Sequence, residues 1–276
     1  MQRQRQCTDV ANEYAINQAR LWLEECQNNH SKCPGKKIPY LPSRVIDVGA
    51  ETTFSHLKLQ INKSNTRARY TALSYCWGGP QSITTTKATL SAHLISLSFK
   101  TLPRTIQDAV KTTQNLGIRF LWVDALCIIQ DCDVDKAQEI NNMGNIYSYA
   151  TLTISAANAK AACDGFLGSR PRIPSCEIPI YHPTSCGTQP RDWMEGASQQ
   201  KVWLTATIKS SDSDEPLYTR GWTLQERLLS SRMLLYGRKE LTWQCQQSST
   251  ESVGTTFYRR STGCMRLPVG IFVTKS

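Results

Sequence analysis

The chain has 276 residues, of which 40% are hydrophobic and 20% charged, and it carries a formal net charge of +10. This composition is typical of a globular protein and excludes a disordered tail, a collagen-like chain and a coiled-coil rod. No stretch approaches the roughly 18 to 20 unbroken apolar residues of a membrane-spanning helix, and residues 1–9 lack the apolar core of a secretory signal, so we expect a cytoplasmic protein without membrane contact.

Residues 1–43 are predicted to form a helical appendage. A loosely helical pattern of apolar residues spans 15–26 and is followed by Asn-rich loop sequence that contains proline. Residues 44–48 and 57–61 then indicate two short strands, for which a hairpin is one arrangement.

Residues 70–155 alternate between strand and helix patterns. The expected strands are residues 70–76, 120–123 and 151–155. Helices are expected to begin after Pro103 and at Asp133. The inner face of the second helix is expected to consist of Ala137, Ile140, Met143 and Tyr147. We therefore predict an α/β fold with a central, mostly parallel sheet and crossover helices, plus a β-hairpin and long irregular insertions.

The last part of the chain is less regular. Residues 162–200 are rich in Pro, Gly and Ser and are predicted to be an irregular insertion. A short helix at 221–229 and a closing hairpin at 232–244 complete an α/β domain that we place at 44–245. Residues 246–276 are expected to form a loosely ordered tail.

Two polar motifs follow neighbouring predicted strands. Cys76, Trp77 and Gly78 follow the first, while Asp124 and the residues up to Gln130 follow the second. Ligands gather beyond the carboxyl ends of parallel strands, so we expect both motifs at one edge of the sheet. Cys76, Trp77, Gly78 and Gln130 are predicted to bind a ligand.

Four sequence blocks together resemble the fungal heterokaryon-incompatibility (HET) domain. They are YTALSYCWGG (70–79), LPRTIQDA (102–109) with LWVDALCIIQD (121–131), MGNIY (143–147) running into TISAA (153–157), and RGWTLQERLL (220–229). The resemblance implies a role in nonself recognition and programmed cell death in filamentous fungi. A distant kinship of this family to TIR domains, some of which cleave NAD, has been proposed.

Two carboxylates are the main candidates for catalysis. Asp124 directly follows an apolar strand, and Glu226 lies in a polar cluster between Arg220 and Arg227. Carboxylates in a shared cleft transfer protons or stabilise an oxocarbenium-like centre, and the two arginines suit a phosphate. Trp222 is a candidate for stacking on the ligand. The structural alternative is that Asp124 caps a turn and that Glu226 forms an ion pair that holds its helix.

The eleven cysteines are odd in number, and several lie in apolar segments, which indicates free thiols. Cys76 and Cys127 are candidates for a nucleophile, with Cys127 placed among the catalytic residues. A reactive thiolate needs a base or a positive environment, and none of the four histidines lies within the four blocks. Burial in the core is the alternative for both cysteines.

Cys26, His30 and Cys33 have a Cys-x3-His-x2-Cys spacing that metals tolerate. A closed zinc site needs a fourth ligand, and Cys7 is the nearest cysteine available. Because no clear fourth ligand accompanies the three, we expect helix packing and no metal. No Gly-x-Gly-x-x-Gly or P-loop pattern is present, so no cofactor is predicted either.

Three functions stay open. The first is a cell-death effector that hydrolyses NAD or a related nucleotide through Asp124 and Glu226. The second is a stand-alone biosynthetic enzyme that performs an acid–base cyclisation, dehydration or condensation, and the third is a non-catalytic interaction module. The partner is then a nucleotide or small molecule, and not a specific nucleic acid, because the basic residues are scattered and carry no binding motif. The sequence does not determine the oligomeric state.

Overall fold

The computed structural model describes residues 8–49, 57–62, 65–171, 175–182, 198–205, 215–219, 221–247 and 251–252. The chain divides into two compact units, of which the first is Met1–Arg170 with Asp212–Ser276 and the second is Pro171–Ser211. Within the described ranges, no helix is both long and apolar enough to cross a membrane.

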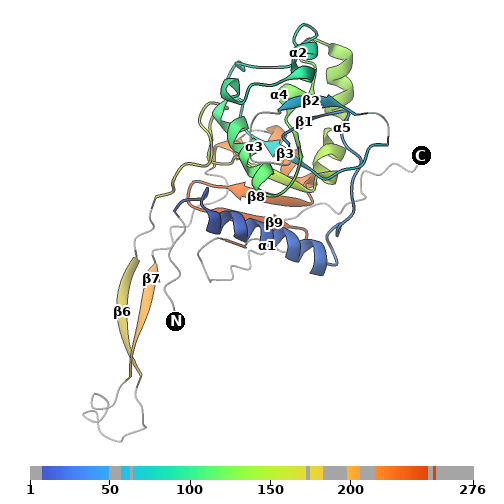
Figure 1. Ribbon diagram of the computed structural model, residues 1–276. Helices are drawn as coiled ribbons and strands as arrows, with labels where there is room; N and C mark the ends of the chain where they lie inside the picture. Colours follow the sequence, from blue (N-terminus) through green and yellow to red (C-terminus); the bar gives the residue numbers. More distant parts are fainter. Residues whose placement is uncertain are drawn as a thin grey trace, which may run out of the picture. The chain divides into compact units, whose positions relative to one another are not determined.

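The first unit is built on an eight-stranded sheet with the order β10-β9-β8-β5-β3-β4-β1-β2 (Figure 1). Its strands are β1 (Arg44–Asp47), β2 (Lys58–Ile61), β3 (Tyr70–Ser74), β4 (Phe120–Trp122), β5 (Leu152–Ser155), β8 (Arg232–Tyr236), β9 (Leu241–Cys245) and β10 (Glu251–Ser252). The four central strands are parallel, and the outer ones pair antiparallel. The predicted α/β fold is confirmed, as are both hairpins, β1–β2 and β8–β9.

Helices connect and cover these strands. They are α1 (Glu13–Asn29), α2 (Leu90–Ile95), α3 (Arg104–Asn115), α4 (Asp124–Cys127), α5 (Asp133–Tyr149) and α6 (Gly221–Leu229), with 3-10 segments η2 (Phe99–Thr101) and η4 (Pro216–Thr219). Pro103 directly precedes α3, as the sequence predicted, because the first turn of a helix does not use the missing N–H.

Helices cover both faces of the sheet. Adjacent residues of a strand point to opposite faces, and in β3 these are Tyr70 and Thr71. The Tyr70 hydroxyl donates a 2.7 Å hydrogen bond to the carbonyl of Ile146 in α5, and the Thr71 hydroxyl lies 2.7 Å from that of Thr113 in α3. Therefore α3 lies on one face and α5 on the other, and every residue of β3 is buried between them.

The first helix belongs to the same unit as the sheet. It runs beside β9 (Figure 1), where the ring centroids of Trp22 and Trp243 are 6.4 Å apart. The side chain of Asn12 caps the start of α1 by accepting a 2.8 Å hydrogen bond from the amide of Ala15. The segment that the sequence predicted as an appendage thus adds its apolar face to the main core.

Two of the four residues predicted for the inner face of α5, Ala137 and Ile140, are exposed. Ile140 is 41% exposed, whereas Glu139 is buried, and Tyr147 is buried as expected. Glu139 is drawn inward because its carboxylate accepts a hydrogen bond from the Ser43 hydroxyl and lies 3.6 Å from the Arg44 guanidinium. Polar partners on β1 and the residue before it therefore override the apolar periodicity of the helix.

The second unit contains an antiparallel hairpin. It is formed by β6 (Ser175–His182) and β7 (Ser198–Thr205), in which Ile178 pairs with Val202. The sequence predicted an irregular insertion at 162–200, because this segment is rich in Pro, Gly and Ser and Pro179 interrupts the strand pattern. Both strands of a two-stranded sheet have an unpaired edge, which is where a strand tolerates proline.

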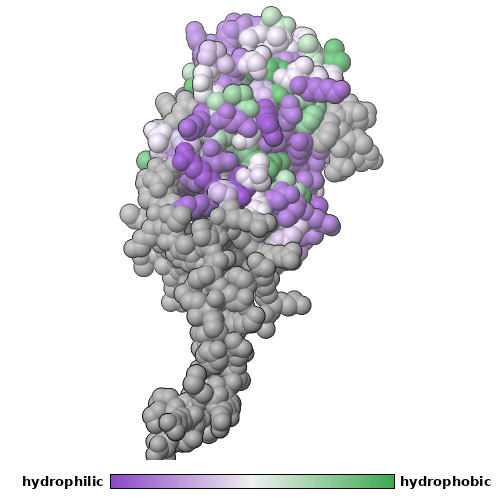
Figure 2. All heavy atoms as spheres, turned by 90° about the vertical axis from the view of Figure 1, so that its left-hand side faces the viewer, coloured by the Kyte–Doolittle hydropathy of each residue, from purple (hydrophilic) through white to green (hydrophobic). Residues whose placement is uncertain are grey.

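The described surface is mostly polar. Figure 2 shows one face, on which hydrophilic side chains predominate and hydrophobic ones form small separate spots. The exposed large hydrophobic residues include Ile95, Val134 and Leu224. Single exposed apolar side chains are ordinary on globular proteins, so these residues indicate no docking surface.

Candidate functional site

The centre of the sheet contains a topological switch point. The carboxyl ends of β3 and β5 lie side by side, with Ser74 paired to Ser155. The chain leaves β3 toward β4 on one side, and it leaves β5 toward β8 on the other. Such a divergence leaves a crevice beyond the strand ends, which is where open α/β sheets bind ligands. The topology therefore marks this edge as the place to look for a site.

Glu226 reaches this edge from α6. Its carboxylate accepts a hydrogen bond from the hydroxyl of Ser74, the last residue of β3, and the residue is only 8% exposed. The end of α6 is bound to the sheet as well, because the hydroxyl of Ser230 donates a 2.7 Å hydrogen bond to that of Thr153 in β5. The helix thus holds a buried carboxylate against the switch point.

Asp124 lies at the same edge, where β4 passes into α4, and it is half-buried. Its Oδ2 accepts a 2.8 Å hydrogen bond from the indole Nε1 of Trp77, which follows β3. Its Oδ1 accepts a 2.7 Å bond from the amide of Ala125, as the structural alternative for this residue requires. The predicted neighbours Trp77 and Asp124 are therefore in direct contact.

Two buried tyrosines are influenced by both carboxylates. Burial, followed by the charge of Asp124, a hydrogen-bonding interaction with its carboxylate and then the charge of Glu226, raises the pKa of Tyr75 well above its usual value. Burial, followed by the charges of Glu226 and Asp124, likewise raises the pKa of Tyr147 in α5. Both phenols stay protonated at neutral pH, and both carboxylates lie within electrostatic reach of the same pair of rings.

Buried polar atoms without a hydrogen-bond partner occur at this edge. Within the described part of the chain the Ser155 hydroxyl has no partner, and the Tyr75 hydroxyl, at the adjacent strand end, makes no hydrogen bond of ordinary geometry, although it lies close enough to Asp124 for that carboxylate to raise its pKa. Tyr147, in contrast, donates a 3.0 Å hydrogen bond to the carbonyl of Leu73. Buried polar groups in native proteins are normally hydrogen-bonded, so the two unsatisfied hydroxyls are where a bound ligand would find partners.

The cysteines of this edge are packed in the core. Cys127 is fully buried, and burial raises its pKa to about 12, so the thiol is protonated at neutral pH. Cys76 is 3% exposed and packs against Met233 and Leu235 of β8. These environments favour the packing alternative over a thiolate nucleophile, which needs a positive and accessible surrounding.

Gly78 and Gln130 have structural roles. Gly78 has a φ of +73°, and a side chain there would place its Cβ 2.1 Å from the Cβ of Ala161, so the close approach of two loops requires a glycine. Gln130 donates 3.0 and 3.2 Å hydrogen bonds to the carbonyls of Asp124 and Ile128. Both residues shape the loops around Asp124, and ligand contact at either of them stays a prediction.

The predicted arginines and tryptophan of the last block are described only in part. The Arg227 guanidinium lies 4.5 Å from the ring centroid of Tyr218 in η4. Arg220 and the side chain of Trp222 lie outside the described residues. A phosphate site at the two arginines therefore stays a prediction.

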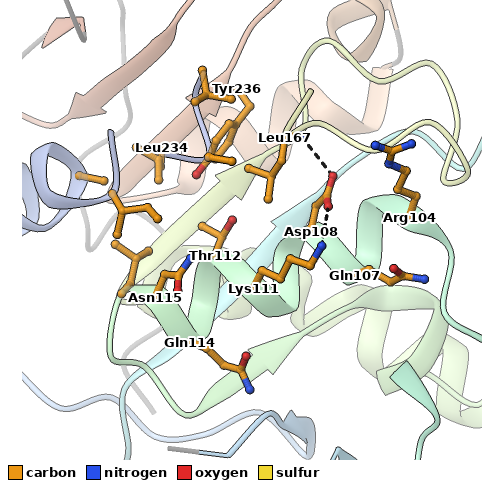
Figure 3. A pocket seen from close by; sticks show the side chains of 15 residues that line it. Arg104, Gln107, Asp108, Lys111, Thr112, Gln114, Asn115, Leu167, Leu234 and Tyr236 are labelled. Atoms are coloured by element: carbon orange, nitrogen blue, oxygen red, sulfur yellow. Dashed lines mark hydrogen bonds and ion pairs between the residues drawn. The ribbon is translucent and has the colours of Figure 1, made fainter. Parts of the chain in front are cut away.

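A cavity of about 750 Å³ lies in a different place, among α1, α3 and β8 (Figure 3). Arg104, Asp108 and Lys111 line it from α3. The Asp108 carboxylate accepts a 3.1 Å hydrogen bond from the amide of Leu167 and lies 3.9 Å from the Lys111 Nζ. None of the predicted site residues lines this cavity, so it gives no support to a biosynthetic pocket that reaches Asp124 or Glu226.

Several residues of the edge did not emerge from the sequence as site residues, namely Ser74, Tyr75, Tyr147 and Ser155. All four lie within the blocks quoted for the family resemblance, and that was the signal that could have singled them out. Their roles depend on partners in other segments; Glu226, for example, is 152 residues from Ser74 along the chain.

The sheet topology makes this an α/β protein with polar side chains at the switch point of its sheet. The comparison with family models then identifies the family. Residues 70–226 match the family described as Heterokaryon incompatibility protein (HET). This stretch is more than half of the chain, begins at β3 and ends at Glu226. The chain therefore belongs to the heterokaryon incompatibility (HET) family, which confirms the resemblance. Comparisons with curated proteins and with solved structures give no match.

Proposed function

We propose that this protein is an effector of the heterokaryon-incompatibility type that hydrolyses the N-glycosidic bond of NAD or a related nucleotide. The proposed site is the edge formed by the carboxyl ends of β3, β4 and β5. The observation that carries the proposal is that both carboxylates raise the pKa of the same tyrosine, Tyr75, while Ser74 and Trp77 hydrogen-bond Glu226 and Asp124 at this edge.

Glu226 is the residue that we assign to the reacting sugar. Cleavage of a glycosidic bond passes through an oxocarbenium-like transition state, which a nearby carboxylate stabilises. Because Glu226 is almost fully buried, little water screens its charge, and its interaction with a developing cation is strengthened.

Asp124 is the residue that we assign to the attacking water. The water oxygen forms the new bond to the sugar carbon as the carbon–nitrogen bond breaks, and nicotinamide leaves with the bonding electron pair. The proton released by the water passes to Asp124 and then to solvent. Tyr75, which is protonated and makes no hydrogen bond of ordinary geometry to another described residue, donates its O–H to a ligand oxygen.

The test is nicotinamide release by the purified full-length chain supplied with NAD. We expect release from the wild type and a loss of about 100-fold or more in Glu226→Gln, which removes the charge and keeps the shape. Glu24→Gln, the same exchange on the exposed face of α1, is the matched control and should keep the wild-type rate. A folded wild-type protein that releases no nicotinamide from NAD or NADP overturns the proposal.

A second candidate function, a non-catalytic interaction module, is favoured by the hydrogen bonds that both carboxylates already make within the protein. Both carboxylates accept hydrogen bonds from protein donors, namely Ser74 for Glu226, and Trp77 and Ala125 for Asp124. In this case the combined change Asp124→Asn and Glu226→Gln leaves the cell-death phenotype intact. The proposed hydrolase requires that the same double variant lose it.

A further inference from the structure

Three thiols and one imidazole meet where the end of α1 approaches β9. Cys26 lies in the last turn of α1, His30 directly follows the helix, Cys33 lies in the next turn, and Cys245 ends β9. One potential ligand atom of each residue lies within 4.8 Å of those of the other three. The His30 Nδ1 is 3.3 Å from the sulfur of Cys245 and 3.9 Å from that of Cys33.

We propose that these four residues bind a structural zinc ion in a closed Cys3His site. Zinc bonds of about 2.3 Å to sulfur and about 2.0 Å to nitrogen, arranged as a tetrahedron, require a sulfur–nitrogen separation of about 3.5 Å. The two separations from His30 Nδ1 lie on either side of that value. Small side-chain rotations are then sufficient to surround an ion.

The local backbone explains why the first three ligands converge. Cys26 and His30 are four residues apart at the end of a helix, so they project from the same side. The amide of Cys33 donates a 3.2 Å hydrogen bond to the carbonyl of His30, which closes a tight turn. The turn continues through Gly35, whose φ of +62° favours glycine.

Buried Arg232 is a second and independent indication of a metal. It is 3% exposed, and its Nε lies 3.1 Å from the sulfur of Cys26. Among the described residues, no ion pair joins Arg232 to a carboxylate. A buried cation without a counter-charge is costly, whereas three thiolates around Zn²⁺ carry one net negative charge. An N–H bond to a ligating sulfur is also the usual outer contact of such sites.

The geometry leaves a route for the ion. His30, Cys33 and Gly35 line a surface cavity of about 430 Å³, and His30 and Cys33 are only partly buried. Cys26 and Cys245 form the buried side of the cluster. An entry path beside a preformed ligand set is what a structural metal site requires.

The zinc site departs from the sequence-based expectation of no metal. Cys245 takes the place for which Cys7 was considered, and it lies 215 residues after His30, so no spacing rule connects them. Cys7 itself lies outside the described residues. All four ligands also lie outside residues 70–226, which match the family model. The ion would join α1 to the sheet, and its presence is independent of the proposed hydrolysis.

The first test is the metal content of the full-length chain, purified without a metal-affinity tag and measured by mass spectrometry. We expect about one zinc per chain in the wild type, and less than about one-fifth of that in Cys245→Ser and in His30→Ala. His30→Cys should retain zinc, because a thiolate replaces the imidazole as a ligand. Cys163→Ser, at an exposed cysteine outside the cluster, is the control and should keep one zinc.

The second test needs only the wild type and therefore decides the matter even if a variant does not fold. After removal of its zinc with a chelator, the protein is supplied with Co²⁺. A tetrahedral site with three thiolates gives intense visible absorption and thiolate-to-cobalt charge-transfer bands. A folded wild-type protein that contains less than about 0.1 zinc per chain and shows no such spectrum overturns the proposal.

Discussion

Two clusters of buried polar side chains contact the same sheet, and they differ in how these side chains are paired. At the strand ends, Glu226 and Asp124 each accept a hydrogen bond from a protein donor, and among the described residues the hydroxyls of Tyr75 and Ser155 make no hydrogen bond of ordinary geometry. At the corner of α1 and β9, the thiols and the imidazole face one another, and one buried cation accompanies them. The strand-end cluster therefore has hydroxyl donors available for a ligand. The Cys and His side chains of the other cluster instead surround one common point, where the proposed zinc ion would bind.

The largest effect is expected from removing Arg232, the buried cation beside the Cys and His side chains. Arg232→Met should lower the free energy of unfolding by about 3–5 kcal/mol, because it leaves a buried negative centre without its partner. It also removes the 2.9 Å hydrogen bond to the carbonyl of Gly35. Denaturant titration of the zinc-loaded protein measures the change.

Arg238→Met, at an exposed position after the same strand, is the control and should change the stability by about 0.5 kcal/mol or less. The effect of Arg232→Met should shrink when a chelator has removed the zinc, because the negative centre is then gone. An effect of equal size with and without metal would contradict the assigned role of Arg232 as the counter-charge.

A smaller effect on stability is expected at the strand-end cluster of Glu226 and Asp124. Trp77→Phe keeps an aromatic ring but removes the indole donor that lies 2.8 Å from Asp124. We expect a loss of about 1–2 kcal/mol in unfolding free energy, since the half-buried carboxylate loses one charge-assisted hydrogen bond and water restores only part of it. Thermal and urea unfolding measure the loss.

A double-mutant cycle with Asp124→Asn shows whether this loss belongs to the pair. Trp77→Phe should cost clearly less when Asp124 is already replaced, because the charged acceptor is absent. Equal losses in both backgrounds would mean that Trp77 contributes through its packing alone, and that the link between β3 and Asp124 has little energetic weight.

Much of the fold could be predicted from residues whose effect is local. Pro103 indicated the start of α3, and the apolar run at 120–123 indicated β4, since both signals act within a few residues. The hairpin β6–β7 was missed because Pro179 breaks the strand pattern, although an edge position tolerates it. Glu139 replaced Ile140 on the inner face of α5 because its partners come from a distant segment.

In the candidate site, too, individual residues were predictable and their distant partners mostly were not. Asp124 and Glu226 were identifiable one by one, because Asp124 directly follows an apolar strand and Glu226 lies in a polar cluster between two arginines. Trp77 was expected at the same edge as Asp124, but Ser74, the partner of Glu226, was not predicted, since strand order determines which distant segments meet. The fourth ligand of the corner, Cys245, was missed for the same reason. Single residues with a chemical role can be predicted from the sequence, whereas contacts between distant segments cannot.

Glu139 offers the last and smallest test, because it is a buried carboxylate that belongs to neither cluster. Burial raises its pKa above the ordinary value of 4.5, although Ser43 and Arg44 act in the opposite direction. One of its oxygens, Oε2, has no hydrogen-bond partner among the described residues. The folded state therefore binds the proton of Glu139 more tightly than the unfolded state does.

The sign of the pH dependence follows from this raised pKa. The stabilising contribution of protonated Glu139 is complete below the unfolded pKa and is lost as the pH rises through the folded pKa. Glu139→Gln cannot titrate and loses nothing, so its stability relative to the wild type should rise between about pH 4 and about pH 7, by about 1 kcal/mol or less. Urea unfolding of both proteins at the two pH values measures the difference, in which the titrations of other groups cancel. A difference that stays constant, or that falls toward pH 7, would mean that Arg44 compensates the buried charge fully, and that a buried carboxylate on this sheet needs no ligand or ion to be tolerated.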